Sequence, residues 1–138
     1  MAALTADFNS YIQNQTAQTG YSIQGGRMAY IGALAQVNAA GTYVLPAASG
    51  TTTKIVGQFV KTVGSGLTVD TEVQIREGDI FLNLGPAPAA TVANIGDQVY
   101  ACSDNEVNLD STNCAKAGIL IAVRDSGCVV RVSQAANL

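Results

Sequence analysis

Ile119-Leu120-Ile121-Ala122-Val123, Arg124-Asp125-Ser126-Gly127 and Cys128-Val129-Val130-Arg131-Val132 follow one another near the C-terminus of the chain. The first and third segments are apolar apart from one Arg, and the segment between them is polar and contains a glycine. A short β-rich run, a polar turn and a second β-rich run are typical of a β-hairpin. The sequence therefore predicts a hairpin over 119–132.

A looser copy of this pattern lies upstream. Lys54-Ile55-Val56-Gly57-Gln58-Phe59-Val60, followed by Val73-Gln74-Ile75-Arg76, parallels Lys116-Ala117-Gly118-Ile119-Leu120-Ile121, followed by Val129-Val130-Arg131-Val132. In both copies a Lys and a Gly precede an apolar run, a loop with glycine follows, and the next strand carries one Arg. We therefore expect a compact all-β body built from such hairpins.

The rest of the chain divides into short segments of β type. The run over 28–37 fits a strand or a short helix by periodicity, but the turn signal Asn38-Ala39-Ala40-Gly41 after it favours a strand. Alternation over 67–76 indicates a strand with one wet face. Further strands are expected over 42–45, 55–60, 80–84, 98–102 and 104–110, with a turn at Glu77-Gly78-Asp79, a single helical turn over 91–97, and a break in pairing at Gly85-Pro86-Ala87-Pro88.

Residues 1–24 differ from the rest, because they are rich in Asn, Gln and Thr and show no alternation. We expect an extended N-terminal arm over 1–24 and a single β domain over 25–138. Large side chains are the exceptions in this arm, and we expect them to bind pockets on another subunit or surface. They are Phe8, Tyr11, Ile12 and Tyr21. The alternative is that the segment folds back on its own body, as terminal segments often do.

Composition and charge argue against several classes of protein. The 138 residues suit one domain, and the net charge is −3 with only seven Lys and Arg. Nucleic-acid binding rests on clustered basic residues, so no nucleic-acid partner is expected. The apolar runs are shorter than the ~20 residues that span a bilayer, and the N-terminus lacks a signal-peptide pattern, so no membrane partner is expected. Only 12% of residues are charged, and such a neutral surface favours contact with protein chains, self-association included.

The sequence contains few residues that could bind a metal ion. Cys102, Cys114 and Cys128 lie far apart, and the chain has no His. We expect the three cysteines to be small buried hydrophobes, with a Cys102–Cys114 disulfide as the alternative. A row of oxygen ligands at spacing two suggests either calcium or a solvated or intersubunit strand face, and the latter is favoured because the Gly and Glu of a calcium loop are missing. This row is Asp104, Glu106, Asn108 and Asp110.

Catalytic patterns are also missing. Without His, a Ser or Cys nucleophile has no usual base. Glu72 and Glu77 could in principle form a glycosidase pair, but nothing around them indicates a raised pKa or a sugar cleft. Gly64-Ser65-Gly66 is not a phosphate loop, because no Gly-Lys-Ser/Thr follows it. We therefore expect a protein that is no enzyme, binds no cofactor or metal, and acts through its surfaces.

A series of short landmarks resembles tailed-bacteriophage head decoration proteins, which are also called capsid cement proteins. The resemblance spans residues 1 to about 133. The landmarks are Leu4-Thr5-Ala6-Asp7, Ile31-Gly32-Ala33-Leu34, Val37-Asn38-Ala39-Ala40-Gly41-Thr42-Tyr43-Val44, Ile55-Val56-Gly57, Val73-Gln74-Ile75-Arg76-Glu77-Gly78, Ile95-Gly96-Asp97-Gln98-Val99-Tyr100, Ala117-Gly118-Ile119-Leu120 and Val129-Val130-Arg131-Val132.

The resemblance implies a small β-barrel or β-tulip body that assembles as a homotrimer. It implies a virion protein, made in the host bacterial cytoplasm, that binds the major capsid protein on the outside of the capsid and bridges neighbouring shell subunits. The arm departs from the relatives because it lacks basic residues, so its contacts are expected to be apolar and hydrogen-bonded. The alternatives are another virion component, such as a tail tube or fibre, and a carbohydrate- or host-surface-binding module with exposed loops such as 83–90.

Overall fold

The protein is all-β, as the sequence predicts. A computed structural model describes residues 3–7, 12–64 and 70–133. Within these residues the only helical element is a 3₁₀ turn, Val92–Asn94, and no helix is long and apolar enough to cross a membrane. The strands are β1 Ile12–Ile23, β2 Leu34–Val37, β3 Val44–Pro46, β4 Ile55–Phe59, β5 Thr71–Leu84, β6 Gln98–Ala101, β7 Glu106–Asn108, β8 Ala115–Arg124 and β9 Gly127–Val132.

The sheet is built from two units with the same strand order. Neighbouring strands run β3-β2-β4-β5 in the first unit and β7-β6-β8-β9 in the second. Counted along the chain, each unit begins with a hairpin, β2 with β3 or β6 with β7. The first strand of the hairpin also pairs with the third strand, β4 or β8, and the third pairs with the fourth, β5 or β9. All of these pairings are antiparallel. The hairpin predicted over 119–132 is β8 with β9, and its upstream copy is β4 with β5.

The two units also share their register. The third strand of each unit has a bulge at one residue that its register with the first strand skips, Val56 in β4 and Ala117 in β8. A glycine follows this residue, and the residue after the glycine pairs with an Arg. The repeat in the sequence therefore marks a repeated bulge, which bends the third strand of each unit. The corresponding pairs are Ala35–Gly57 and Val99–Gly118, then Gln58–Arg76 and Ile119–Arg131.

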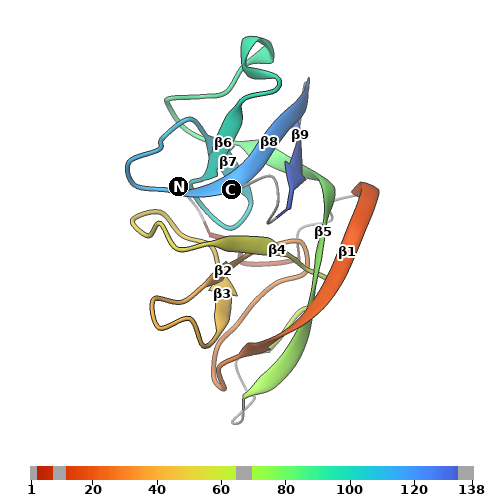
Figure 1. The fold of residues 1–138 in the computed structure, drawn as a ribbon, viewed down its shortest axis with the longest axis vertical. Helices are drawn as coiled ribbons and strands as arrows, with labels where there is room; N and C mark the ends of the chain where they lie inside the picture. The colour runs from red at the N-terminus through yellow and green to blue at the C-terminus, as the bar shows by residue number, and fades with distance from the viewer. Residues whose placement is uncertain (1–2, 8–11, 65–69, 134–138) are drawn as a thin grey trace.

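Strand β5 joins the units, and Figure 1 shows it running from the upper part of the molecule to its lower end. Its N-terminal part pairs with β4, residues 78–82 pair with β9, and Asn83 and Leu84 pair in parallel with β7. The pairings β5–β7, β7–β6, β6–β8, β8–β9 and β9–β5 close a ring. The first unit stays open and ends at β3, and β1 lies along β5. The whole is a barrel-like body.

The turn predicted at Glu77-Gly78-Asp79 is wrong, because β5 continues through it. Turn signals act over a few residues, but here the chain pairs with β1 on both sides of Gly78, and Gln15 lies opposite Gly78 itself. The φ angle of Gly78 is 153°, a value that lets the strand change its partner from β4 to β9 without ending. The Gly85-Pro86-Ala87-Pro88 break follows the end of β5 as predicted.

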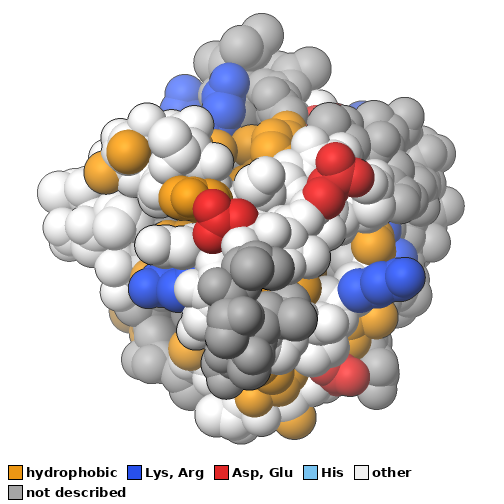
Figure 2. Space-filling view, turned by 90° about the horizontal axis from the view of Figure 1, so that it is seen from below, with side chains coloured by type: hydrophobic (Ala, Val, Ile, Leu, Met, Phe, Trp, Pro, Cys, Tyr) orange, Lys and Arg blue, Asp and Glu red, His pale blue; other side chains and the backbone are white. Residues whose placement is uncertain are grey.

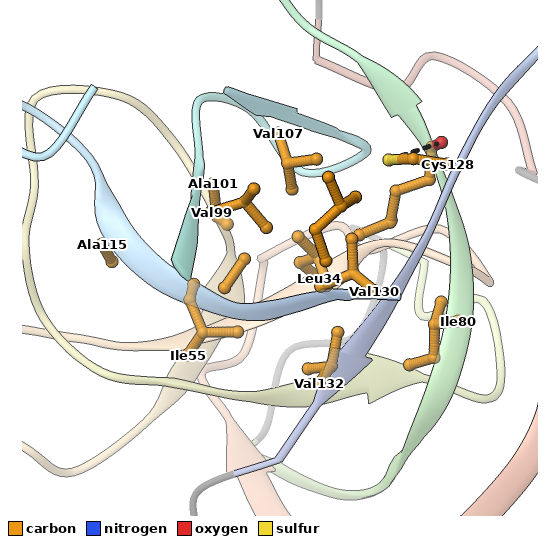
Figure 3. Packing of buried hydrophobic residues seen from close by; sticks show 14 of the residues in the cluster. Leu34, Ile55, Ile80, Val99, Ala101, Val107, Ala115, Cys128, Val130 and Val132 are labelled. Carbon is orange, nitrogen blue, oxygen red and sulfur yellow. Dashed lines mark hydrogen bonds between the residues drawn. The ribbon is translucent and has the colours of Figure 1, made fainter. Parts of the chain in front are cut away.

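Two hydrophobic clusters form the core, and β5 contributes to both. The upper cluster fills the ring, and Figure 3 shows Val99, Val107, Val130 and Leu34 pointing toward one another there. Its buried members are Leu34, Ala47, Ile55, Ile80, Leu82, Ala90, Val99, Ala101, Val107, Ala115, Ala117, Leu120, Cys128, Val130 and Val132. Leu34 comes from the first unit, so the upper cluster extends across the boundary between the units. The lower cluster lies between the first unit and β1. Its fully or nearly fully buried members are Ile23, Ala29, Ala33, Ala35, Val44, Val56, Phe59, Val63, Val73 and Ile75.

The N-terminal segment expected as an arm is part of the sheet over 12–23. Strand β1 pairs antiparallel with β5, from Ile12 opposite Ile80 to Ile23 opposite Thr71. This pairing corresponds to the alternative in which the segment folds back on its own body. Ile23 is 1% exposed, so the end of β1 is anchored in the lower cluster as well as by its backbone.

Candidate binding surface

The residues first weighed for chemistry do not assemble into a catalytic or metal site. Within the described ranges, no three Cys, Asp or Glu side chains gather as a metal site would require. Glu72 and Glu77 lie five residues apart on β5, and side chains an odd number of residues apart on a strand point to opposite faces. These two carboxylates therefore do not share one cleft.

Charged side chains are few in this protein, 12% of the residues. On the end of the molecule that Figure 2 shows, most of the acidic and basic side chains are separated by uncharged ones. The ion pair between Arg131 and Asp79, at 2.9 Å, lies where β5 meets β9. The hydrogen bond that the Arg131 guanidinium donates to the Asp79 carboxylate is the main reason that the pKa of Arg131 is raised. A surface of this kind suits contacts made by shape and neutral hydrogen bonds.

Of the predicted anchor residues, the structure describes the side chain of Tyr21 alone. Phe8 and Tyr11 lie outside the described residues, and so does the side chain of Ile12, the first residue of β1. Tyr21 is described, and its half-buried ring packs against the lower cluster. A change at Tyr21 would therefore perturb the fold, and its role as an anchor for a partner stays a prediction.

The N-terminal residues 3–7 are tied to both units. The backbone N–H of Leu4 donates to the Asp104 carboxylate at 3.0 Å and 3.3 Å, and the Leu4 side chain packs against the lower cluster. The Thr62 hydroxyl donates to the Asp7 carboxylate. The segment therefore crosses from the second unit to the first and holds them together.

The contact between Leu4 and Asp104 shows that the row Asp104, Glu106, Asn108 and Asp110 is not the solvated face that the sequence analysis expects. Asp104 is 2% exposed and Asn108 is 3% exposed. Asp104 lies before β7, where the N-terminal segment covers it, and the Asn108 amide donates to the Pro86 carbonyl at 3.4 Å. Sequence alternation missed both residues, because the groups that cover them come from distant parts of the chain.

Replacing Asp104 by Asn is expected to remove a pH dependence of stability. Burial raises the pKa of the Asp104 carboxyl above 3.8, against the opposing effect of the Leu4 hydrogen bond. A raised pKa in the folded state means that the carboxyl's contribution is fully present below the unfolded pKa and is lost as pH rises through the folded pKa. The free energy of unfolding of the wild type, minus that of Asp104→Asn, should therefore fall as pH rises above 3.8. Urea unfolding of both proteins over a pH series measures this difference, and a constant or rising difference would contradict it.

The cysteines behave as predicted from the sequence. Cys102, Cys114 and Cys128 are buried and free, so the alternative disulfide does not form. Burial raises the pKa of the Cys102 and Cys128 thiols to about 12. Thiols of this kind stay protonated at neutral pH and act as small hydrophobes.

An apolar tip is the surface feature that the sequence analysis missed. Val92 is 67% exposed and Ile95 is 47% exposed, and no other large hydrophobic side chain in the described ranges is exposed. The tip is held rigidly, because Gly96 N–H donates to the Leu120 carbonyl at 2.8 Å and Leu120 N–H donates to the Asp97 carbonyl at 3.0 Å. Figure 1 shows it as the loop with the short helical turn at one end of the molecule.

Comparison of the chain with known protein families, with curated proteins and with solved structures finds no match.

Proposed function

We propose that the protein is a structural virion component that binds the outside of a bacteriophage capsid as a homotrimer and stabilises the shell by bridging major capsid subunits. The observation that carries the proposal is the resemblance to head decoration proteins. Several of its landmarks coincide with the residues that build the two-unit body. Ile55-Val56-Gly57 and Ala117-Gly118-Ile119 contain the two bulges, and Val73-Gln74-Ile75-Arg76 lies in the shared strand β5.

The character of the surface supports the same proposal. Only 12% of the residues are charged, so the exposed side chains are mostly neutral. The stabilising action would be mechanical, since packed DNA presses outward on the joints of a phage shell. A trimer seated across these joints adds buried interface area that must be lost before the joint opens.

The test is binding to bare shells of a tailed phage. Light scattering should give three times the 14.1 kDa mass of one chain, and binding to shells should saturate in multiples of three copies per site. A monomer that ignores the shell would refute the proposal. Retention by a glycan array would then support the host-surface-binding alternative.

The double variant Tyr11→Ala with Ile12→Ala is expected to weaken shell binding by roughly 30-fold, because large apolar anchors carry most of the energy of an interface. The isolated protein should keep its circular dichroism spectrum and its trimer mass. The measurement is a binding isotherm on bare shells, followed by sedimentation and gel densitometry.

The matched control is Val92→Ala with Ile95→Ala, which removes two large apolar side chains from the exposed tip. If this variant loses binding while the arm variant keeps it, the arm assignment is wrong and the tip is the docking element. The shell-binding proposal itself survives that outcome.

The residues of the loop expected to bind carbohydrate give little support to that alternative. Its expected loop, 83–90, contains neither an aromatic nor a charged side chain. Sugar recognition usually relies on stacking aromatics and directed polar groups, so this loop offers few of the contacts that it would need.

A further inference from the structure

The exposed tip belongs to a turn that both units contain. Ala29-Tyr30-Ile31-Gly32 in the first unit corresponds to Ala93-Asn94-Ile95-Gly96 in the second. The two glycines have φ angles of 91° and 92°, and each donates its backbone N–H to the third strand of its unit, to the Phe59 carbonyl at 3.0 Å or the Leu120 carbonyl at 2.8 Å. The residue after each glycine accepts a hydrogen bond from the same strand residue, at 2.9 Å and 3.0 Å. Ile95 therefore occupies the position in the second unit that Ile31 occupies in the first.

In the first unit, a segment that follows β4 covers this turn. Val63 N–H donates to the Ala29 carbonyl at 2.7 Å, and Ala29 N–H donates to the Val63 carbonyl at 3.1 Å, so the two residues form an antiparallel bridge. The Ile31 N–H donates to the Thr62 hydroxyl at 3.1 Å. Ala29 is 0% exposed and Val63 is 7% exposed, and both belong to the lower cluster. The cover is thus an extended segment that supplies backbone hydrogen bonds and a β-branched side chain.

The second unit lacks a corresponding cover within the described residues. Only Asp125 and Ser126 join β8 to β9, so the chain has no segment after β8 that could lie over the turn. The backbone forms the 3₁₀ turn Val92–Asn94 there, and Ala93 is exposed, with no hydrogen bond to its N–H or its carbonyl in the described ranges. The tip therefore presents an open backbone donor and acceptor beside its two apolar side chains.

We propose that the tip binds an extended segment of a partner protein that carries an aliphatic side chain, in the way that Val63 covers Ala29 in the first unit. The partner's identity rests on the proposed function, under which the segment belongs to the major capsid protein. A second copy of this chain is disfavoured, because no large hydrophobic side chain outside the tip is exposed in the described ranges. A lipid surface is disfavoured too, because residues 85–96 contain no Lys, Arg, Tyr or Trp.

The turn is preformed for this contact. Its glycine and the residue after it are hydrogen-bonded to Leu120 on β8, so binding does not require the loop to become ordered first. In such complexes the backbone hydrogen bonds contribute affinity, and the side chains of the extended segment contribute specificity.

The test compares Ile95→Asp with a control, Ala40→Asp. Both variants add one negative charge at an exposed position, the control in the turn between β2 and β3. We expect Ile95→Asp to bind bare shells about tenfold more weakly, because the carboxylate would be covered by an apolar side chain. Ala40→Asp should match the wild type within about twofold, and both variants should keep its melting temperature and trimer mass. Because the arm and the tip would contact the shell separately, the arm variant and the tip variants should each bind more weakly.

Cross-linking gives a second readout. A photoreactive phenylalanine analogue in place of Val92 should cross-link on shells to a segment of the major capsid protein that contains an aliphatic residue, and the same analogue in place of Ala40 should not. If the wild type binds shells but Ile95→Asp binds equally well and position 92 gives no cross-link to the shell, the inference is wrong and the proposed function stands. Cross-links between copies, or loss of the trimer mass in Ile95→Asp, would place the tip in an interface between copies and also overturn the inference. Failure of the wild type to bind shells overturns both proposals.

Discussion

Replacing Gly118 by Ala is expected to lower the free energy of unfolding by about 3 kcal/mol or more, because the added methyl has no space. A Cβ at this position would overlap the Arg131 carbonyl oxygen and would lie 3.0 Å from Cγ1 of Val130. The overlapping atom is backbone in a strand that also pairs with β5, so it cannot move without breaking the ring. Thermal unfolding followed by circular dichroism should show a melting temperature lower by about 10 °C.

Gly64→Ala is the matched control, since nothing lies within 4 Å of a Cβ at that position. Its melting temperature should stay close to that of the wild type. Gly57 is the corresponding glycine of the first unit, and a Cβ there would lie 2.5 Å from the Arg76 carbonyl oxygen. Gly57→Ala should therefore also destabilise the protein. If Gly118→Ala were as stable as Gly64→Ala, the Arg131 carbonyl oxygen would have to lie farther from Gly118 than it does in the structure, which would contradict the prediction.

Replacing Phe59 by Ala is expected to cost about 3–5 kcal/mol, the usual range for removing a buried aromatic ring. Phe59 is 0% exposed and is the largest fully buried side chain of the described residues. It belongs to the lower cluster with Ile23, Val73 and Ile75, and its removal leaves a cavity between the first unit and β1. Urea unfolding of the variant and of the wild type measures the loss.

Phe59→Leu is the control, because it keeps most of the apolar volume and should cost only about 1 kcal/mol. The same variants test whether the two units fold together. Strand β5 contributes Ile75 to the lower cluster and Ile80 to the upper one, so Phe59→Ala should weaken both clusters in one transition. Hydrogen exchange that opens the first unit alone, with β6–β9 fully protected, would contradict this coupling.

Local patterns in the sequence were enough to predict the all-β class, the C-terminal hairpin, its upstream copy and the single helical turn before β6. Each of these depends on residues close together in the chain. Apolar runs on both sides of Asp125 and Gly127 can pair as soon as the turn forms, and the turn residues act over only two to four positions. The repeated glycine was visible as well, although its reason was not. That reason is a carbonyl oxygen on the neighbouring strand.

Contacts between distant segments decided the rest. The chain continues through Gly78 because β1, more than 50 residues earlier, pairs across it. Asp104 is buried because the backbone of Leu4, 100 residues away, donates to its carboxylate. The β3–β4 loop of the first unit lies beside the β7–β8 loop of the second because Thr51 bridges with Cys114. The sequence by itself therefore determined the all-β class, the β8–β9 hairpin with its upstream copy, and the helical turn before β6, whose energetics are local. Only the tertiary structure decided which strands become neighbours and which polar groups they cover, because many distant pairings had to be satisfied at once.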